Sequence, residues 1–348
     1  VQVSANWMAA SGDPKQDSAL RNGVEALSKM SVDLEVSIPV GKDSLSMKTK
    51  WNEEKNEYEV TSPLSGIISA MAPVEDISHS VTPELNVDED SVILVIKINQ
   101  KNRLAGSIFS EVTESKYTET PDIDDVKLFK SLFNHIQKLI KDSKILAMHD
   151  ISDGGLVTAL AEMCFTKKVG MSIQVDDIDS INKTLFSEEI GFVIQVKSDD
   201  LDIVKSSLDE INIYVEEVAT IVEESFSILC KEKEVFSESI TVLEKYWRET
   251  SHAIQSIRDN KKIADSELNL LDNKNYHGLN SNVSFDENQI KNLSIKGTKP
   301  KVAILREQGV NGQNEMAAAF TIAGFEAFDV HMQDLSLIHI SEPTRLAT

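Results

Sequence analysis

The 348-residue sequence contains only two cysteines and no apolar run long enough to cross a membrane. Two cysteines, Cys164 and Cys230, exclude a disulfide framework and a four-cysteine zinc site. Both follow apolar residues, where a free cysteine behaves as a small buried hydrophobic side chain. The best apolar runs, Leu64–Val74 and Val92–Ile98, fall well short of the roughly 18 residues of a membrane span. With no secretory signal either, we expect a cytoplasmic protein.

Positive charge is also scarce, since 35 Lys and Arg stand against 57 Asp and Glu, for a formal net charge of −22. Such a surface repels phosphate backbones and anionic lipids, so we expect no nucleic-acid partner and no membrane partner. An anionic substrate would have to be captured by a metal ion or by backbone N–H groups. The composition is otherwise ordinary for a globular protein, with 41% hydrophobic residues. The length predicts about two or three domains.

Apolar periodicity predicts alternating helices and strands. We expect helices over 15–30, 125–141, 156–164, 200–209 and 238–258. We expect strands at 34–40, 64–74, 91–98, 145–149, 171–175, 191–196, 213–220 and 225–230, with turns at Gly41 and at 52–57. Eight of the forty residues from Asp259 to Thr298 are Asn, and the periodicity is lost there, which indicates a connector.

The residues from Lys299 onward predict a separate unit. A strand (KVAIL), a helix over 314–323 and a second strand (FEAFDVHM) follow one another, as at the start of a parallel doubly wound domain. The closing peptide SLIHISEPTRLAT, from 336 to 348, resembles translated sequencing-adapter read-through, and we exclude it from the fold. Because the chain also opens on Val1 inside an apolar segment, we expect a piece of a longer protein.

The segment HDISDGG, at 149–155, carries the clearest chemical pattern, because a predicted strand ends there and a helix begins. Asp150 offers a hard oxygen ligand of the kind that Mg²⁺ prefers. Ser152 can hydrogen-bond a phosphate oxygen, and the two glycines would aim backbone N–H groups at an anion. The same pattern is equally typical of a helix that Asp153 caps after a glycine turn.

A second candidate is PVGKDSLSM, at 39–47. Gly41 permits a tight turn, Lys42 supplies a positive charge and Ser44 a hydroxyl near it. The segment is not a P-loop, because the glycine spacing is absent and no helix follows. The alternative is a turn between two strands with a solvated lysine.

Two further loops leave their role open. Trp7, in SANWMAASGDP, could belong to the core or line a cleft. The segment REQGVNG, at 306–312, lies between a strand and a helix, where α/β domains bind ligands, but an ordinary turn has the same pattern. The histidines at 79, 135, 252 and 277 show no paired spacing that suits a metal site.

Six segments occur in a fixed order along the chain: SANWMAASGDP, IPVGKDSLSMKTKW, TSPLSGIISA, HDISDGGLVTALAEM, LFSEEIGFVIQV and KVAILREQGVNGQNEMAAAF. Together they resemble the family of large, single-chain phosphoribosylformylglycinamidine synthases. The resemblance runs from Val1 to about Asp334, and six ordered motifs are far more specific than any one of them.

The resemblance implies a fold class and a set of boundaries. We expect an α+β synthetase half, with aminoimidazole-ribonucleotide-synthetase-like N- and C-subdomains, followed by the truncated start of an α/β class I glutaminase domain. The implied boundaries are 1–87 for a partial N-subdomain, 88–235 for the C-subdomain, 236–298 for a helix and connector, 299–334 for the start of the glutamine amidotransferase domain, and 335–348 for a non-native tail.

The resemblance also implies a reaction of purine synthesis. In this family ATP phosphorylates the amide oxygen of formylglycinamide ribonucleotide, and ammonia from glutamine then displaces the phosphate to give the amidine. The implied cofactors are ATP or ADP and Mg²⁺. The implied partners are those small-molecule substrates and the missing domains of the same polypeptide.

Residue by residue, Asp150 resembles a Mg²⁺ ligand and Ser152 a nucleotide contact of an auxiliary site that holds ADP. The resemblance places Lys42 and Ser44 in a loop that is phosphate-proximal in related smaller synthases, although those synthases have Asn where this chain has Lys42. The Cys, His and Glu of the glutaminase would lie beyond Asp334, and the remaining metal ligands before Val1. No catalytic residue is therefore assigned, and we expect the fragment alone to be inactive.

Two other interpretations share these residues. The chain could be a non-catalytic nucleotide-binding scaffold that holds structural ADP and Mg²⁺. It could also be another ATP-using enzyme of the superfamily, similar to selenophosphate synthetase or thiamine-monophosphate kinase. The strand–helix–strand unit after Lys299 argues against the last, because those enzymes lack a glutaminase.

Overall fold

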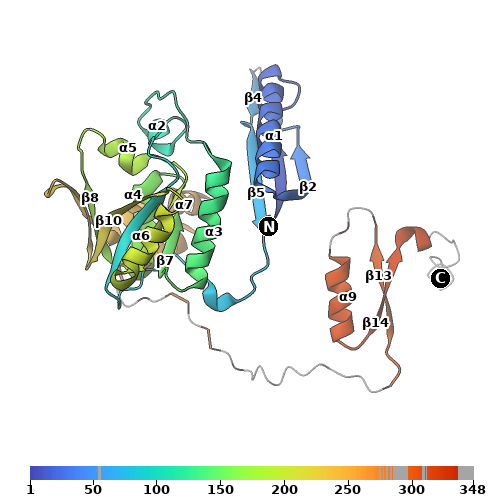
Figure 1. The fold of residues 1–348 in the computed structure, drawn as a ribbon. Helices are drawn as coiled ribbons and strands as arrows, with labels where there is room; N and C mark the ends of the chain where they lie inside the picture. The colour runs from blue at the N-terminus through green and yellow to red at the C-terminus, as the bar shows by residue number, and fades with distance from the viewer. Residues whose placement is uncertain are drawn as a thin grey trace. The chain divides into compact units, whose positions relative to one another are not determined.

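The computed structural model describes residues 1–53, 56–273, 276, 278–279, 281–282, 284, 297–307, 310 and 312–335. These residues form two units, Val1–Tyr276 and His277–Thr348, which are described separately (Figure 1). The first unit contains two sheets and a hairpin, and the second contains one pair of strands.

The first sheet has three strands in the order β2–β1–β5: β1 (Gln2–Met8), β2 (Ser37–Ser44) and β5 (Ser65–Met71). The parallel strands β1 and β2 are joined by helix α1 (Pro14–Leu34), and β5 runs antiparallel to β1. The carboxylate of Asp13 accepts hydrogen bonds from the first backbone N–H groups of α1, and Pro14 takes the first helical position. These signals confirm the helix predicted at 15–30.

Trp7 lies on strand β1, not in a loop, and its half-buried ring packs between α1 and β5. Its ring lies so close to α1 that a Cβ atom at Gly23 would stand 2.9 Å from the ring, and one at Gly66 would stand 3.1 Å away. The two glycines therefore make the space in which the indole packs between helix and sheet.

The second sheet has seven strands in the order β12–β11–β8–β10–β6–β9–β7. All neighbours are antiparallel except β8 and β11. The strands are β6 (Ser91–Lys97), β7 (Ala147–Asp150), β8 (Gly170–Val175), β9 (Gly191–Lys197), β10 (Tyr214–Val222), β11 (Ser225–Cys230) and β12 (Lys233–Ser239).

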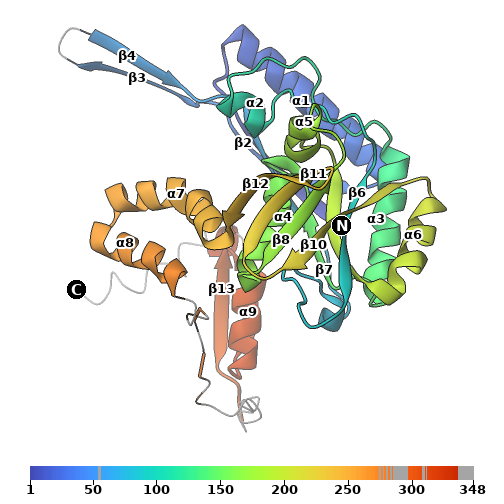
Figure 2. The same ribbon diagram turned by 90° about the vertical axis from the view of Figure 1, so that its left-hand side faces the viewer.

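Helices cover both faces of this sheet (Figures 1 and 2). The helices of the unit's second part are α2 (Ile108–Val112), α3 (Val126–Lys141), α4 (Gly155–Lys167), α5 (Ile181–Phe186), α6 (Leu201–Asp209), α7 (Ile240–Arg258) and α8 (Lys261–Asn269). On one face, Ile93 and Val95 of β6 pack with α4, α5 and α7. On the other, Leu94 and Ile96 pack with α3 and α6. Burial on both faces explains why β6 is apolar at consecutive positions.

The chain around Gly41 differs from the prediction. Strand β2 runs through Gly41, which pairs with Ala5 of β1, so the expected turn is wrong. A Cβ atom at Gly41 would stand 3.2 Å from the Ala5 carbonyl oxygen, which shows that the glycine serves a close approach of two strands. The predicted reversal at 52–57 is confirmed by β3 (Lys48–Glu53) and β4 (Asn56–Thr61), an exposed hairpin (Figure 2).

Part of the expected connector is helical. Helix α8 packs along α7, where Ala264 is buried and Asp265 accepts a hydrogen bond from His252 at 3.0 Å. A single buried alanine gives too weak an apolar pattern to be seen in the sequence. Strand β12 and the short helices α2 and α5 were not predicted either. Strand β12 is mostly exposed, and the two helices have only 5 and 6 residues, so none of them has a clear apolar period.

The second unit contains the parallel strands β13 (Lys301–Arg306) and β14 (Glu326–His331), joined by helix α9 (Gln313–Ile322). This confirms the predicted strand–helix–strand order and its parallel pairing. Residues 308, 309 and 311 of the loop REQGVNG, and the closing residues 336–348, lie outside the described residues.

Both cysteines are free and buried, as the sequence predicts. Burial raises the pKa of the Cys164 thiol to about 12, so this sulfur is an inert part of the core. Among the described residues, none of the helices is long and apolar enough to cross a membrane.

A buried ion pair fastens the long loop that follows β6. Glu189 is fully buried, and its carboxylate accepts hydrogen bonds from Arg103 Nε at 2.6 Å and Nη2 at 2.7 Å. Arg103 also donates through its backbone N–H at 3.0 Å, and Asn99 donates from its amide at 3.2 Å. Burial opposes ionisation of Glu189, but these donors outweigh it and hold the pKa of the carboxyl below its usual value.

We expect Glu189→Ala to lower the free energy of unfolding by about 3 kcal/mol, because the Arg103 guanidinium loses its fully buried partner and keeps only Asp124 and the Asp122 carbonyl oxygen. Urea denaturation near pH 7 measures this. The difference from the wild type should shrink as the pH falls through the lowered pKa of Glu189. As a control, Glu59→Ala removes an exposed partner of Lys48 and Lys50 and should leave the free energy of unfolding nearly unchanged. Equal costs would contradict this account.

Gly155, at the start of α4, is required by both backbone conformation and space. Its φ is +75°, and a Cβ atom there would stand 2.6 Å from the carbonyl carbon of Phe186. Gly12 has a φ of +95° and open space around it. We expect Gly12→Ala to cost about 1 kcal/mol from strain alone, and Gly155→Ala about 2–3 kcal/mol more from the clash. Thermal or urea unfolding of both variants tests this, and equal losses would refute the steric part.

Candidate functional site

The loop HDISDGG leaves the seven-stranded sheet at its edge. Asp150 is the last residue of β7, which pairs only with β9 within the sheet. Its side chain is 66% exposed, and its Oδ1 lies 3.4 Å from Nδ1 of His149. The predicted strand end and helix start are confirmed, so the carboxylate stands in solvent just before the first turn of α4.

Ser152 lies beside Asp150 on the same exposed turn. Its side chain is exposed, and its carbonyl oxygen accepts a hydrogen bond from the N–H of Gly155 at 3.0 Å. The turn therefore presents the Ser152 hydroxyl between two exposed carboxylates, those of Asp150 and Asp153.

The sequence predicts that the two glycines aim their N–H groups at an anion. This prediction is wrong, because both N–H groups are bonded within the protein. The N–H of Gly154 donates to Oε1 of Glu188 at 2.9 Å, and the N–H of Gly155 donates to Ser152. The same Glu188 oxygen accepts from the N–H of Ile108, at the start of α2, at 2.9 Å. A carboxylate of the protein itself thus fills the place of an anion at two helix N-termini.

The alternative role for Asp153 is also wrong, because the N-cap of α4 is Gly154, which makes no side-chain capping bond. Gly154 takes a left-handed conformation, with a φ of 84°. The helix start is capped from a distant part of the chain by Glu188 instead of by the nearby aspartate.

Lys42 and Ser44 lie on the other sheet, near the end of β2. Lys42 Nζ donates to Ser44 Oγ at 2.8 Å, and Lys42 is paired in register with Asn6 of β1. The amide oxygen of Asn6 is buried without a hydrogen-bond partner among the described residues. The structure thus groups Lys42, Ser44 and Asn6 as one polar cluster. No hydrogen bond or ion pair among the described residues connects this cluster to Asp150 or Ser152.

The donor set at Asp150 suits magnesium that arrives with phosphates. Mg²⁺ keeps several waters and is bound through one or two carboxylates plus phosphate oxygens. The exposed carboxylate of Asp150 provides such an oxygen. No cluster of three or more His, Cys, Asp or Glu that could hold a metal ion by itself occurs in the part of the chain that the structure describes.

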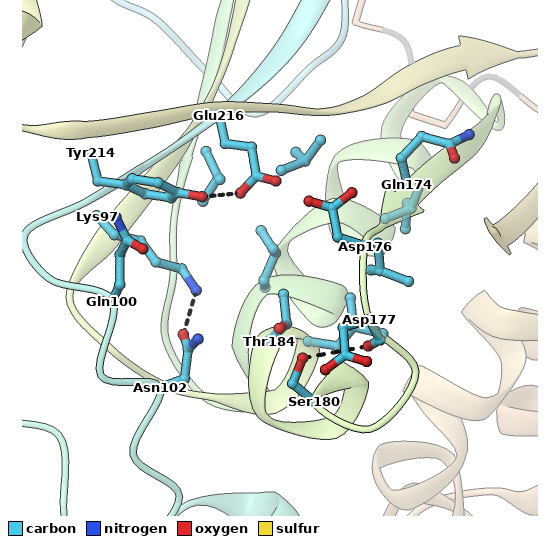
Figure 3. A pocket seen from close by; sticks show the side chains of 16 residues that line it. Lys97, Gln100, Asn102, Gln174, Asp176, Asp177, Ser180, Thr184, Tyr214 and Glu216 are labelled. Atoms are coloured by element: carbon cyan, nitrogen blue, oxygen red, sulfur yellow. Dashed lines mark hydrogen bonds between the residues drawn. The ribbon is translucent and has the colours of Figure 1, made fainter. Parts of the chain in front are cut away.

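A polar cavity of about 150 Å³ lies elsewhere in the C-terminal part of the first unit (Figure 3). Lys97 is 4% exposed there and donates to Asn102 Oδ1 at 3.1 Å; burial lowers its pKa. Tyr214 donates to Glu216 Oε2 at 2.5 Å. With Asp176 and Asp177 also in its wall, the cavity has more negative than positive groups, so it does not suit a phosphate.

Sequence reasoning missed Glu188 and Glu189, although both lie in the quoted segment LFSEEIG. Their partners are separated from them by 34 to 90 residues along the chain. The available signal was two acidic residues inside an otherwise apolar stretch, since carboxylates are rarely buried unless they are paired.

Three protein families match successive parts of the chain. Residues 1–73 match the FGAR-AT PurM_N-like domain, residues 88–231 match the AIR synthase related protein, C-terminal domain, and residues 299–346 match the CobB/CobQ-like glutamine amidotransferase domain. Asp150 and Ser152 lie in the second match, and Lys42 and Ser44 in the first.

Solved structures share the fold at low sequence identity. Phosphoribosylformylglycinamidine synthase II from Thermotoga maritima has a TM-score of 0.53 at 11% identity, over 70% of this chain and 37% of that one. T. maritima PurL complexed with ATP has a TM-score of 0.50 at 12% identity, with the same coverage. The chain thus spans little more than a third of these proteins. The three successive domain matches and the shared fold together support a fragment of a phosphoribosylformylglycinamidine synthase.

Proposed function

We propose that this chain is part of an ATP-dependent amidoligase of purine synthesis, in which its first unit holds a magnesium-bound adenine nucleotide. The whole enzyme would convert formylglycinamide ribonucleotide, glutamine, ATP and water to formylglycinamidine ribonucleotide, glutamate, ADP and phosphate. The observation that carries the proposal is the exposed Asp150–Ser152 turn at the sheet edge, within the domain that matches the AIR synthase C-terminal family. A solved relative of the same fold is complexed with ATP.

In this proposal Asp150 holds Mg²⁺ through its exposed carboxylate, and Ser152 donates its hydroxyl to a phosphate oxygen. When bound, the metal ion offsets the charge of the phosphates. Lys42 and Ser44 contribute from the other sheet as a second phosphate-contacting group, with the Lys42 ammonium held by Ser44.

The electrostatics of the turn make the metal ion necessary. Residues 150–155 include two carboxylates and no basic residue, and Glu188 adds a third carboxylate beside them. The N–H groups of Gly154 and Gly155 are already used within the protein. A phosphate therefore meets net negative charge at this loop unless a divalent cation comes with it.

A non-catalytic role for this site is the second candidate. The N-terminus of α4 is filled by Glu188, so the Gly154 N–H cannot stabilise a charge that develops on a phosphate. This suits a site that holds ADP and Mg²⁺ as a structural element. Turnover of the bound nucleotide distinguishes the two candidates. A structural site would keep its ADP unchanged during catalysis, whereas a catalytic site would convert ATP to ADP.

We expect Asp150→Ala to weaken Mg²⁺-dependent binding of ADP at least about tenfold, or about 1.4 kcal/mol, because the metal loses its protein ligand. Calorimetric titration of ADP into the full chain, with and without Mg²⁺, measures this. Asp153→Ala is the matched control, since it removes an exposed carboxylate three residues further on and should change the affinity less than about twofold. Unchanged affinity in Asp150→Ala, or no binding of ADP by the wild type, would refute the assignment.

We also expect this chain to release no glutamate from glutamine. A glutaminase of this class needs an activated cysteine, and both cysteines here are buried in the core. A coupled glutamate assay measures the activity, and slow alkylation of both thiols in the native chain, compared with urea, provides the control. Glutaminase activity that Cys164→Ser abolishes would contradict this expectation.

A further inference from the structure

His149 precedes the candidate metal ligand, and it is held at both ring nitrogens. Nδ1 lies 2.8 Å from the backbone carbonyl oxygen of Asp150, and Nε2 lies 2.9 Å from Oε2 of Glu162 on α4. The His149 side chain is 16% exposed and that of Glu162 is 26% exposed, so solvent screens this contact only in part.

The contact continues to α7. The indole Nε1–H of Trp247 donates to the second carboxylate oxygen of Glu162, Oε1, at 2.8 Å. The Trp247 ring packs against Phe165 of α4 with ring centroids 5.7 Å apart. Glu162 therefore accepts from one partner at each oxygen, and its carboxylate has a single orientation between the two helices and the edge strand.

This chain of contacts ends on the peptide group that follows Asp150. His149 holds the carbonyl oxygen of that peptide, and the N–H of Ile151 donates to the carbonyl oxygen of Gly191 at 3.0 Å. A peptide group held on both sides fixes ψ of Asp150, and with it the direction in which the side chain leaves the strand. Neither the side chain of His149 nor that of Glu162 has a role in the proposed function.

We propose that His149, Glu162 and Trp247 form a positioning relay that orients Asp150 for its metal ion. The inference rests on the proposed function, since it takes Asp150 as the Mg²⁺ ligand. It adds that the orientation of this ligand depends on α7, the helix that follows the seven-stranded sheet in the chain. Partners that orient a ligand raise the affinity for the metal without touching it.

The test compares two variants with a matched control. Glu162→Gln leaves a single side-chain oxygen for two donors, His149 and Trp247. Trp247→Phe keeps the ring contact with Phe165 but removes the N–H donor. Glu84→Gln is the control. It removes a different carboxylate, which pairs with Lys167 at the end of α4, beyond Glu162. We expect the Mg²⁺ concentration for half-maximal ADP binding to rise about 3- to 10-fold in both relay variants and to stay the same in the control.

A double-mutant cycle separates positioning from general stability. If the relay acts through Asp150, Glu162→Gln should change ADP binding less than about twofold in an Asp150→Ala background. Full additivity of the two substitutions would overturn the relay. An Asp150→Ala variant that binds Mg²⁺ and ADP normally would instead refute the proposed function.

Amide chemical shifts of the nucleotide-free chain test the relay even if Asp150 binds no metal ion. The backbone amide resonances of Asp150 and Ile151 report the held peptide group. We expect both to shift in Glu162→Gln and Trp247→Phe, and neither to shift in Glu84→Gln. Unshifted resonances in the two relay variants would overturn the inference, whatever the nucleotide affinity.

Discussion

The architecture around the candidate site depends on two adjacent carboxylates, Glu188 and Glu189. One closes the N-termini of α2 and α4, and the other is fully buried against Arg103. Together they join three segments that are far apart in the sequence: the loop after β6, the turn before α4 and the start of β9. Glu188 also holds Gly154 in place, because its carboxylate accepts the hydrogen bond from the Gly154 N–H.

The same two residues decide what the turn can bind. A helix N-terminus with free N–H groups would attract a phosphate directly. Here Glu188 uses the Gly154 N–H and adds negative charge, so the turn offers solvent the Ser152 hydroxyl and the carboxylates of Asp150 and Asp153. The negative charge of this loop, in an acidic protein, attracts a cation. A phosphate then binds through that cation.

Support for that loop comes from both sides. Behind the turn, Gly155 leaves room for the backbone of Phe186, and in front of it His149 connects the peptide after Asp150 to α4 and α7. Few side chains touch the candidate ligand itself, but several elements hold its backbone. Precise placement of one exposed carboxylate therefore rests on packing that lies outside the loop.

Most of the elements and the order of the three domains could be predicted from the sequence, because apolar periodicity is strong in β6 and α3 and because six ordered segments resemble one family. Prediction failed where the decisive contact is distant: strand β2 continues through Gly41, α8 packs on α7 through one alanine, and the glycine N–H groups bond to Glu188. Local pattern reports which face of an element is buried, but it holds no record of partners 34 to 90 residues away. That a glutamate takes the place expected for a phosphate follows from tertiary contacts alone.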